Sequence, residues 1–144
     1  MEQQLFDTLH YFLRFQYPPT ISEIHRYMHL LVSEFEVKRE VERLQVVGAI
    51  RIEQERVFLT DRNYDGYFVR KQQSEELLRR ARSYLTNLEY ISSINLIGIS
   101  GSMSMLNGTS LDDIDLFIIT RSGSLWSTRF LVLLYKKLIS LVDR

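Results

Sequence analysis

Apolar residues recur at helical spacing near the start of the chain. Leu5 and Leu9 belong to a stripe that predicts an amphipathic helix. This helix should end before the Tyr-Pro-Pro segment at 17–19, because the residue before a proline disfavours helical backbone. Thr20 lies three residues before Glu23, a spacing that is typical of a capping box at the start of a helix. The pattern therefore predicts two helices joined by a proline-rich turn.

A third helix and a hairpin follow. Ser33 is a suitable N-cap, and Gly48 suits the left-handed position that ends a helix. Two short runs rich in β-branched and apolar residues, at 50–52 and 56–60, predict strands separated by a polar turn. Three helices and a hairpin are the outline of a winged helix-turn-helix. Residues 1–68 are therefore predicted to form a winged-helix-like domain.

The charge of the third helix bears on whether this domain binds DNA. A helix that enters the major groove needs a basic surface to neutralise phosphates. This helix is slightly acidic, with Glu34, Glu36, Glu40 and Glu42 against Lys38, Arg39 and Arg43. Two hypotheses stay open, a nucleic-acid-binding domain and a docking module of the same fold, and the charges favour the second.

The second half of the chain, predicted as one domain over 69–144, alternates helices with strands. The hydrophobic pattern predicts a long helix at 69–88, a strand at 94–100, a short helix at 103–106, a strand at 116–120 and an apolar helix at 125–142. The fold class is therefore α+β. The last helix is apolar enough to predict a surface for self-association or for a protein partner.

The composition excludes several classes of functional site. The 144 residues carry a formal net charge of zero and include no cysteine, which excludes disulfides, zinc–thiolate sites and a cysteine nucleophile. The polar, acidic N-terminus is unlike a signal peptide. Lys136 and Lys137 interrupt the most apolar segment, which is too short to span a membrane. We therefore expect a cytoplasmic protein with no membrane partner.

Four residues between 101 and 115 predict a phosphate and metal site. Gly101 and Ser102 follow a strand, where backbone N–H groups and a hydroxyl suit phosphate oxygens. Asp113 and Asp115 head the next strand two residues apart, so alternation predicts both carboxylates on one face. Neighbouring carboxylates repel each other, and Mg²⁺ or Mn²⁺ would neutralise both. The sequence thus predicts a metal-assisted phosphoryl or nucleotidyl transfer.

One family resemblance covers most of the chain. The segments 97–102 and 112–120 resemble the signature of the DNA polymerase beta-type nucleotidyltransferase superfamily, in which Gly-Ser after a hydrophobic strand precedes Asp-x-Asp on a second strand. The wider chain resembles a group of uncharacterised bacterial nucleotidyltransferase-domain proteins. This wider resemblance includes the Tyr-Pro-Pro-Thr segment at 17–20, the Leu-Trp pair at 125–126 and Arg129.

The resemblance implies a function. It implies that the winged-helix-like domain is followed by a partial nucleotidyltransferase α/β core, in which Gly101 and Ser102 bind a nucleoside triphosphate and Asp113 and Asp115 ligate Mg²⁺ or Mn²⁺. The implied reaction moves a nucleoside monophosphate to an acceptor hydroxyl on a nucleic acid, a protein or a small molecule. The alternative is a nucleic-acid-binding or partner-binding protein whose nucleotidyltransferase-like domain is inactive.

The superfamily also has a third carboxylate on a later strand. After residue 120 the chain has one acidic residue, Asp143, at a predicted helix end. Asp112 stands where relatives often have serine, which should add negative charge near the metals. We therefore expect this chain to be the front portion of a longer protein or a natural truncation.

Overall fold

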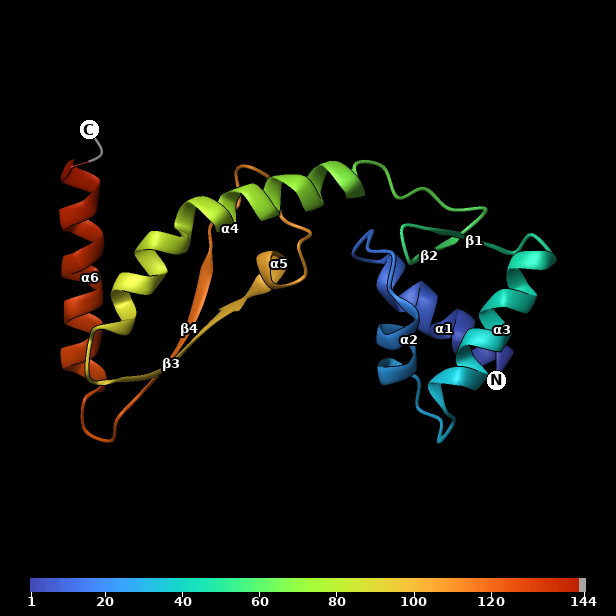
Figure 1. Cartoon of the computed structure of the whole chain (residues 1–144), viewed down its shortest axis with the longest axis horizontal. Helices are drawn as coiled ribbons and strands as arrows, with labels where there is room; N and C mark the ends of the chain where they lie inside the picture. Colours follow the sequence, from blue (N-terminus) through green and yellow to red (C-terminus); the bar gives the residue numbers. More distant parts are fainter. Residues whose placement is uncertain (143–144) are drawn as a thin grey trace. The chain divides into compact units, whose positions relative to one another are not determined.

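The computed structural model describes residues 1–142 and is a mixed α+β structure, which confirms the predicted fold class (Figure 1). Contacts divide the chain into two units, Met1–Tyr67 and Phe68–Arg144. The predicted domain boundary lies one residue after this division. Each unit contains one two-stranded antiparallel sheet.

The first unit begins with the helices α1 (Glu2–Leu13), α2 (Ile21–Tyr27) and α3 (Glu34–Val46). The Thr20 hydroxyl accepts the Glu23 amide at 3.2 Å, and the Glu23 carboxylate accepts the Thr20 amide at 2.7 Å. The predicted capping box is therefore confirmed. Ser33 caps α3 as predicted, and it forms a second capping box with Glu36. Gly48 follows α3 with a φ of 79°, the left-handed conformation expected there.

A hairpin completes the first unit. It consists of β1 (Ile50–Glu53) and β2 (Arg56–Leu59), which pair antiparallel. The turn at 54–55 has positive φ at both residues, as a type I′ hairpin turn requires. An extended segment before α2 joins the hairpin, because Thr20 bridges to Arg56 and the Val57 amide donates to the Pro19 carbonyl at 2.9 Å. The hairpin is thus tied to the connection between α1 and α2.

Apolar faces of the three helices and the hairpin meet in one core. The buried side chains include Leu5, Leu9, Phe12, Ile24, Val37, Val41, Leu44, Ile50, Val57 and Phe58. The helical members repeat at spacings of three and four residues, which places them on one side of each helix. Burial of this apolar surface is the main source of stability of the unit.

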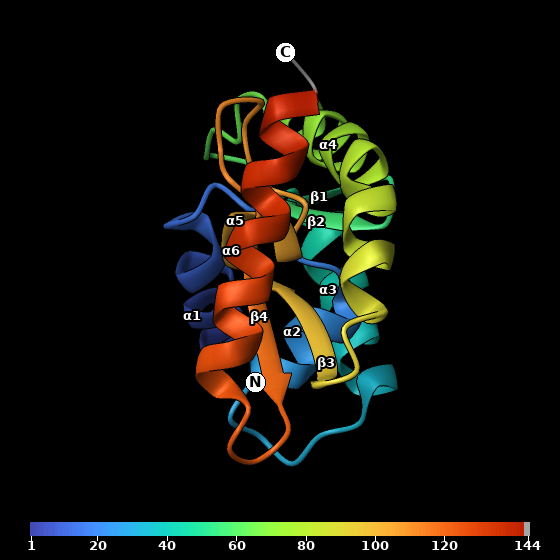
Figure 2. The ribbon, with the colours of Figure 1, turned by 90° about the vertical axis from the view of Figure 1, so that its left-hand side faces the viewer.

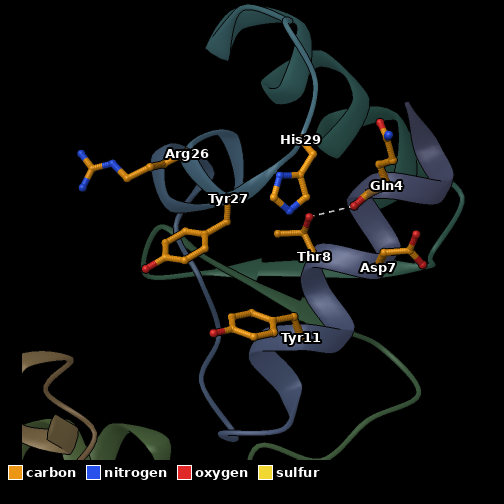
Figure 3. A pocket seen from close by; sticks show the side chains of 7 residues that line it. All are labelled: Gln4, Asp7, Thr8, Tyr11, Arg26, Tyr27 and His29. Atoms are coloured by element: carbon orange, nitrogen blue, oxygen red, sulfur yellow. Dashed lines mark hydrogen bonds between the residues drawn. The ribbon is translucent and has the colours of Figure 1, made fainter.

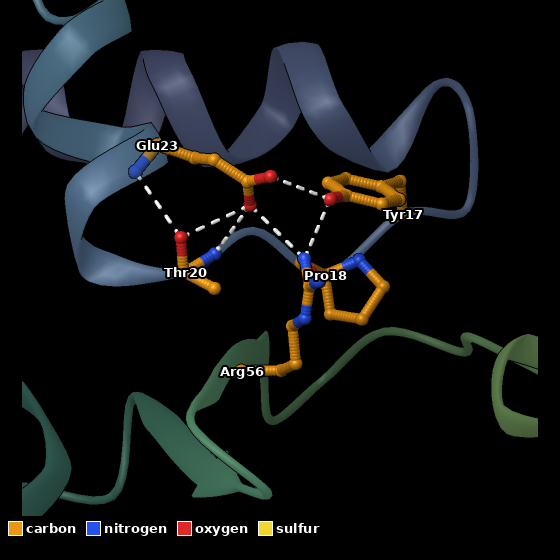
Figure 4. A network of polar contacts seen from close by, with 5 residues as sticks. All are labelled: Tyr17, Pro18, Thr20, Glu23 and Arg56. Atoms are coloured by element: carbon orange, nitrogen blue, oxygen red, sulfur yellow. Dashed lines mark hydrogen bonds and ion pairs between the residues drawn. The ribbon is translucent and has the colours of Figure 1, made fainter. Parts of the chain in front are cut away.

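A polar network lies beside this core (Figure 4). The Arg56 guanidinium donates to the Tyr17 hydroxyl at 2.6 Å and to the Pro18 carbonyl at 3.2 Å. It also forms an ion pair with Glu23 at 3.0 Å, and Tyr17 donates to the same carboxylate at 2.6 Å. The side chains of Arg56 and Glu23 are 14% and 29% exposed. The network therefore joins β2 to the start of α2 in a partly desolvated setting.

Buried Tyr17 predicts a loss of stability at alkaline pH. Burial, together with the hydrogen bond to Glu23, raises the pKa of Tyr17 above its ordinary value of about 10. The unfolded chain then loses this proton at a lower pH than the folded chain. The contribution is fully present below about pH 10 and is lost above it, at up to about 1.4 kcal/mol per pH unit. Urea unfolding between pH 8 and pH 11 measures the slope. Tyr17→Phe should reduce this slope but not abolish it, because burial also raises the pKa of Tyr64, whereas the exposed Tyr11→Phe should leave the slope unchanged.

The second unit contains α4 (Tyr67–Glu89) apart from its first residue, β3 (Ile94–Ser100), α5 (Gly101–Ser104), β4 (Asp115–Thr120) and α6 (Leu125–Val142). Strands β3 and β4 lie side by side (Figure 2), with Ser100 paired to Asp115 at one end and Ile94 paired to Thr120 at the other. The predicted elements are all present. Helix α5 begins two residues earlier than predicted, because the positive φ of Gly101 turns the chain immediately after β3.

Much apolar surface of the second unit is exposed. In α6, within the part of the helix whose side chains the structure describes, Thr128 is the one buried residue. The exposed apolar side chains of this helix are Leu125, Trp126, Phe130, Leu131, Leu133, Leu134 and Leu138. Self-association or partner binding through α6 stays a prediction. No helix among the described residues has the length and hydropathy needed to cross a membrane.

Candidate functional site

The predicted site lies at one end of the β3–β4 pair. Ser100 ends β3 in an extended conformation, and Gly101 turns the chain with a φ of 67° into α5. Asp115 is the first residue of β4 and pairs with Ser100. The Ser100 hydroxyl also donates to the Asp115 carbonyl at 3.4 Å. Antiparallel pairing therefore places the glycine turn next to the first residue of the second strand.

The Asp115 side chain is directed at this turn. A Cβ atom built on Gly101 would lie 2.6 Å from the Asp115 Oδ2 atom. Real Cβ contacts are longer than this, so the residue at 101 must lack a side chain while Asp115 keeps its orientation. The structure thus brings together two of the four predicted site residues, Gly101 and Asp115.

Asp112 holds the intervening loop. Its carboxylate accepts from the Thr109 amide and from the Thr109 hydroxyl, each at 3.0 Å, and from the Ser102 hydroxyl at 3.1 Å. These bonds, those from Thr109 first, hold the pKa of Asp112 below its ordinary range. The negatively charged Asp112 carboxylate thus accepts hydrogen bonds from Thr109 in the loop and from Ser102 in α5. Because a serine hydroxyl has one proton to donate, Ser102 would bind a phosphate oxygen through its amide, or through its hydroxyl after release from Asp112.

Helix α4 also forms hydrogen bonds with this loop. Ser74 is fully buried, and its hydroxyl both donates to the Gly108 carbonyl and accepts the Gly108 amide, each at 3.0 Å. Arg70 donates to the Asn107 side-chain oxygen at 2.9 Å, and the Asn107 amide donates to the Ser102 carbonyl at 3.0 Å. These three residues of α4 and the loop, Arg70, Ser74 and Asn107, had no role in the sequence-based site. Arg70 belongs to the basic face of this helix, which suits a solvent-exposed face or a helix that flanks a phosphate site, whereas no local pattern indicates a site role for Ser74 or Asn107.

Asp113 lies outside the strand. Because β4 begins at Asp115, strand alternation does not fix the direction of the Asp113 side chain, contrary to the expectation that both residues head the strand. Asp113 is exposed and has no hydrogen-bond or ion-pair partner within residues 1–142. In that same range no three acidic or histidine side chains are grouped to hold a metal ion. Asp143, the remaining acid considered for the site, lies outside the described residues.

The donor set still suits one class of metal. Mg²⁺ binds oxygen atoms, keeps several waters and is commonly held by one or two carboxylates plus substrate phosphates. Asp115, directed at a turn where a Cβ does not fit, supplies one such carboxylate, and exposed Asp113 in the preceding loop is a second carboxylate nearby in sequence. Carboxylate oxygens are the kind of ligand that Mg²⁺ and Mn²⁺ prefer, so the chemistry of these two side chains is compatible with either ion.

Comparison with protein-family models, curated proteins and solved structures finds no match to this chain. The function must therefore be argued from the sequence pattern and the geometry.

A hollow of about 610 Å³ on the first unit is a separate candidate (Figure 3). Tyr11 and Tyr27 line it, with ring centroids 6.2 Å apart and nearly parallel planes. Thr8, another lining residue, donates to the Gln4 carbonyl at 2.8 Å. His29 and Asp7 add polar groups, but no residue of the predicted site is present. Among the described residues, the acidic and histidine side chains of this lining do not belong to a group that could hold a metal ion, and the hollow supports no specific reaction.

Proposed function

We propose that this chain is a metal-dependent nucleotidyltransferase that moves a nucleoside monophosphate from a nucleoside triphosphate to an acceptor hydroxyl. The observation that supports this most directly is the approach of the Asp115 carboxylate to the Gly101 turn. A carboxylate, a side-chain-free turn and a hydroxyl residue close together suit a polyphosphate with its cation. The strand–turn–helix order and the pairing of β3 with β4 support the same proposal.

Each residue has a specific role in the proposed site. The amides of Gly101 and Ser102 bind phosphate oxygens, and the absence of a Cβ at 101 leaves room for the Asp115 carboxylate beside the turn. Asp113 and Asp115 hold Mg²⁺ or Mn²⁺, which when bound neutralises charge on the triphosphate. The acceptor oxygen forms a bond to the α-phosphorus while the bond from that phosphorus to the bridging oxygen breaks. Pyrophosphate leaves, and the hydroxyl proton passes to solvent.

We further propose that the first unit is a winged-helix-like domain. Three helices are followed by a hairpin, and the short extended segment at Thr20 pairs with the hairpin at Arg56. Three helices followed by a hairpin are the outline expected of a winged helix-turn-helix, and this order supports the proposal. The domain's role is a separate question from the chemistry of the second unit.

Replacing the carboxylates tests the proposed reaction. Asp115→Asn keeps the size of the side chain next to Gly101 but removes its charge. We expect it, and Asp113→Asn, to reduce magnesium-dependent transfer of α-phosphate label by about 100-fold, because both remove a metal ligand. The assay uses each of the four nucleoside triphosphates, and calorimetry measures binding of the magnesium–nucleotide complex. Asp61→Asn, a surface change in the first unit, is the matched control.

Two results would contradict the proposal. One is a wild-type chain that binds no nucleoside triphosphate at millimolar magnesium and nucleotide concentrations. The other is an Asp115→Asn variant that binds the magnesium–nucleotide complex as tightly as the Asp61→Asn control does.

A further inference from the structure

A second hollow of the first unit lies along α3. Its cavity volume is about 750 Å³, and its lining comes from the start of α2, the first half of α3 and the hairpin. The apolar lining residues are Ile21, Phe35 and Ile52. We call this hollow the α3 groove.

Phe35 is the most unusual residue of the α3 groove. Its side chain is 72% exposed, whereas Val37, Val41 and Leu44 on the opposite side of the same helix are buried in the core. The core therefore does not need Phe35. An exposed aromatic ring at a concave surface is typical of an anchoring contact in protein recognition, since its burial removes a large apolar area from water.

The charges of the α3 groove are predominantly negative. Glu34, Glu42 and Glu55 line it, against one lysine, Lys38. Glu34 accepts a hydrogen bond from the Ser22 hydroxyl, which joins α3 to α2 but leaves its negative charge in place. Across residues 1–142 none of these three glutamates forms an ion pair. A phosphate backbone entering this groove would meet net negative charge.

We propose that the α3 groove docks a short cationic segment of another protein. An apolar side chain of that segment packs against Phe35 and Ile52, and its lysine or arginine side chains pair with Glu34, Glu42 and Glu55. Charge complementarity selects this occupant over nucleic acid, because DNA binding depends on neutralising phosphates with basic side chains. The inference does not depend on nucleotide chemistry in the second unit.

Binding of defined peptides to the full chain tests this proposal. The probe is a fluorescein-labelled peptide of alternating lysine and leucine, compared with the matching glutamate–leucine peptide and with a double-stranded DNA oligonucleotide. We expect the cationic peptide to bind at least tenfold more tightly than either comparison ligand at physiological salt. Amide chemical shifts should change around residues 34–42 and at the hairpin turn. Affinity should fall several-fold between 50 mM and 300 mM salt.

Substitutions of the acidic residues and of Phe35 test whether the peptide binds in the α3 groove. Glu42→Lys with Glu55→Lys should weaken the cationic peptide at least tenfold, whereas Glu89→Lys on α4 should change its affinity less than twofold. Phe35→Ala should weaken it about fivefold, whereas Val46→Ala, also exposed on α3, should not.

Three outcomes would overturn the proposal. If the DNA oligonucleotide bound more tightly than the cationic peptide, the α3 groove would be a nucleic-acid-binding surface instead. Shifts at the groove that depend on the concentration of the chain alone would assign it to a second copy. Equal losses in the groove variants and their controls would show that the peptide binds elsewhere.

Discussion

Replacing Gly101 by alanine is expected to weaken binding of a magnesium–nucleoside triphosphate complex by about 100-fold. The new Cβ would lie 2.6 Å from Asp115 Oδ2, so the carboxylate must rotate or the turn must move. Either change separates the proposed metal ligand from the amides proposed to bind phosphate, and loss of the contacts that orient a metal ligand typically costs about 10- to 100-fold in metal affinity. Calorimetric titration of the variant with magnesium and each nucleotide measures the effect.

Gly123→Ala is the matched control for this substitution. Gly123 has a φ of 75°, close to the 67° of Gly101, but no atom lies within 4 Å of the position of its Cβ. Both variants should lose about 1 kcal/mol of unfolding free energy, because alanine disfavours left-handed backbone. Loss of nucleotide binding should be confined to Gly101→Ala. Unchanged nucleotide affinity in Gly101→Ala would show that the contact with Asp115 has no part in binding.

Local chemistry made most of the first unit predictable. Thr20 and Glu23 specify the start of α2 because a hydroxyl and a carboxylate three residues apart satisfy each other's backbone amides. Ser33 and Gly48 act in the same local way at the two ends of α3. Such signals require no knowledge of the rest of the fold.

The details of the candidate site depended on contacts that are distant in sequence. The start of β4 is set by pairing of Asp115 with Ser100, fifteen positions earlier, which leaves Asp113 in the preceding loop. The bonds between Ser74 and Gly108 join residues 34 positions apart. Hydrophobic periodicity reports the face of a helix but not the segment that meets it. The residue types of the site could therefore be predicted, whereas its supporting contacts could not.

Removing the guanidinium of Arg56 should have the largest effect on the stability of the first unit. We expect Arg56→Ala to lower its free energy of unfolding by about 3 kcal/mol, because the partly buried Glu23 carboxylate loses its ion-pair partner and the Pro18 carbonyl loses its donor. Hydrogen exchange at the Val57 amide, which donates to Pro19 beside the network, gives a reading specific to this unit. Its protection should fall by about 100-fold, in line with that loss of free energy.

Two further experiments test how much of the stability loss in Arg56→Ala comes from the lost ion pair and how much from lost side-chain packing. Arg62→Ala removes an ion pair with Asp61 whose side chains are 51% and 72% exposed, so it should cost less than about 0.5 kcal/mol. Combining Arg56→Met with Glu23→Gln should recover at least half of the loss caused by Arg56→Met alone, because glutamine still completes the capping box and no unpaired charge remains. If Arg56→Ala costs no more than Arg62→Ala, water already screens the network. The link between β2 and the start of α2 would then be held by the backbone bridge at Thr20 rather than by the ion pair.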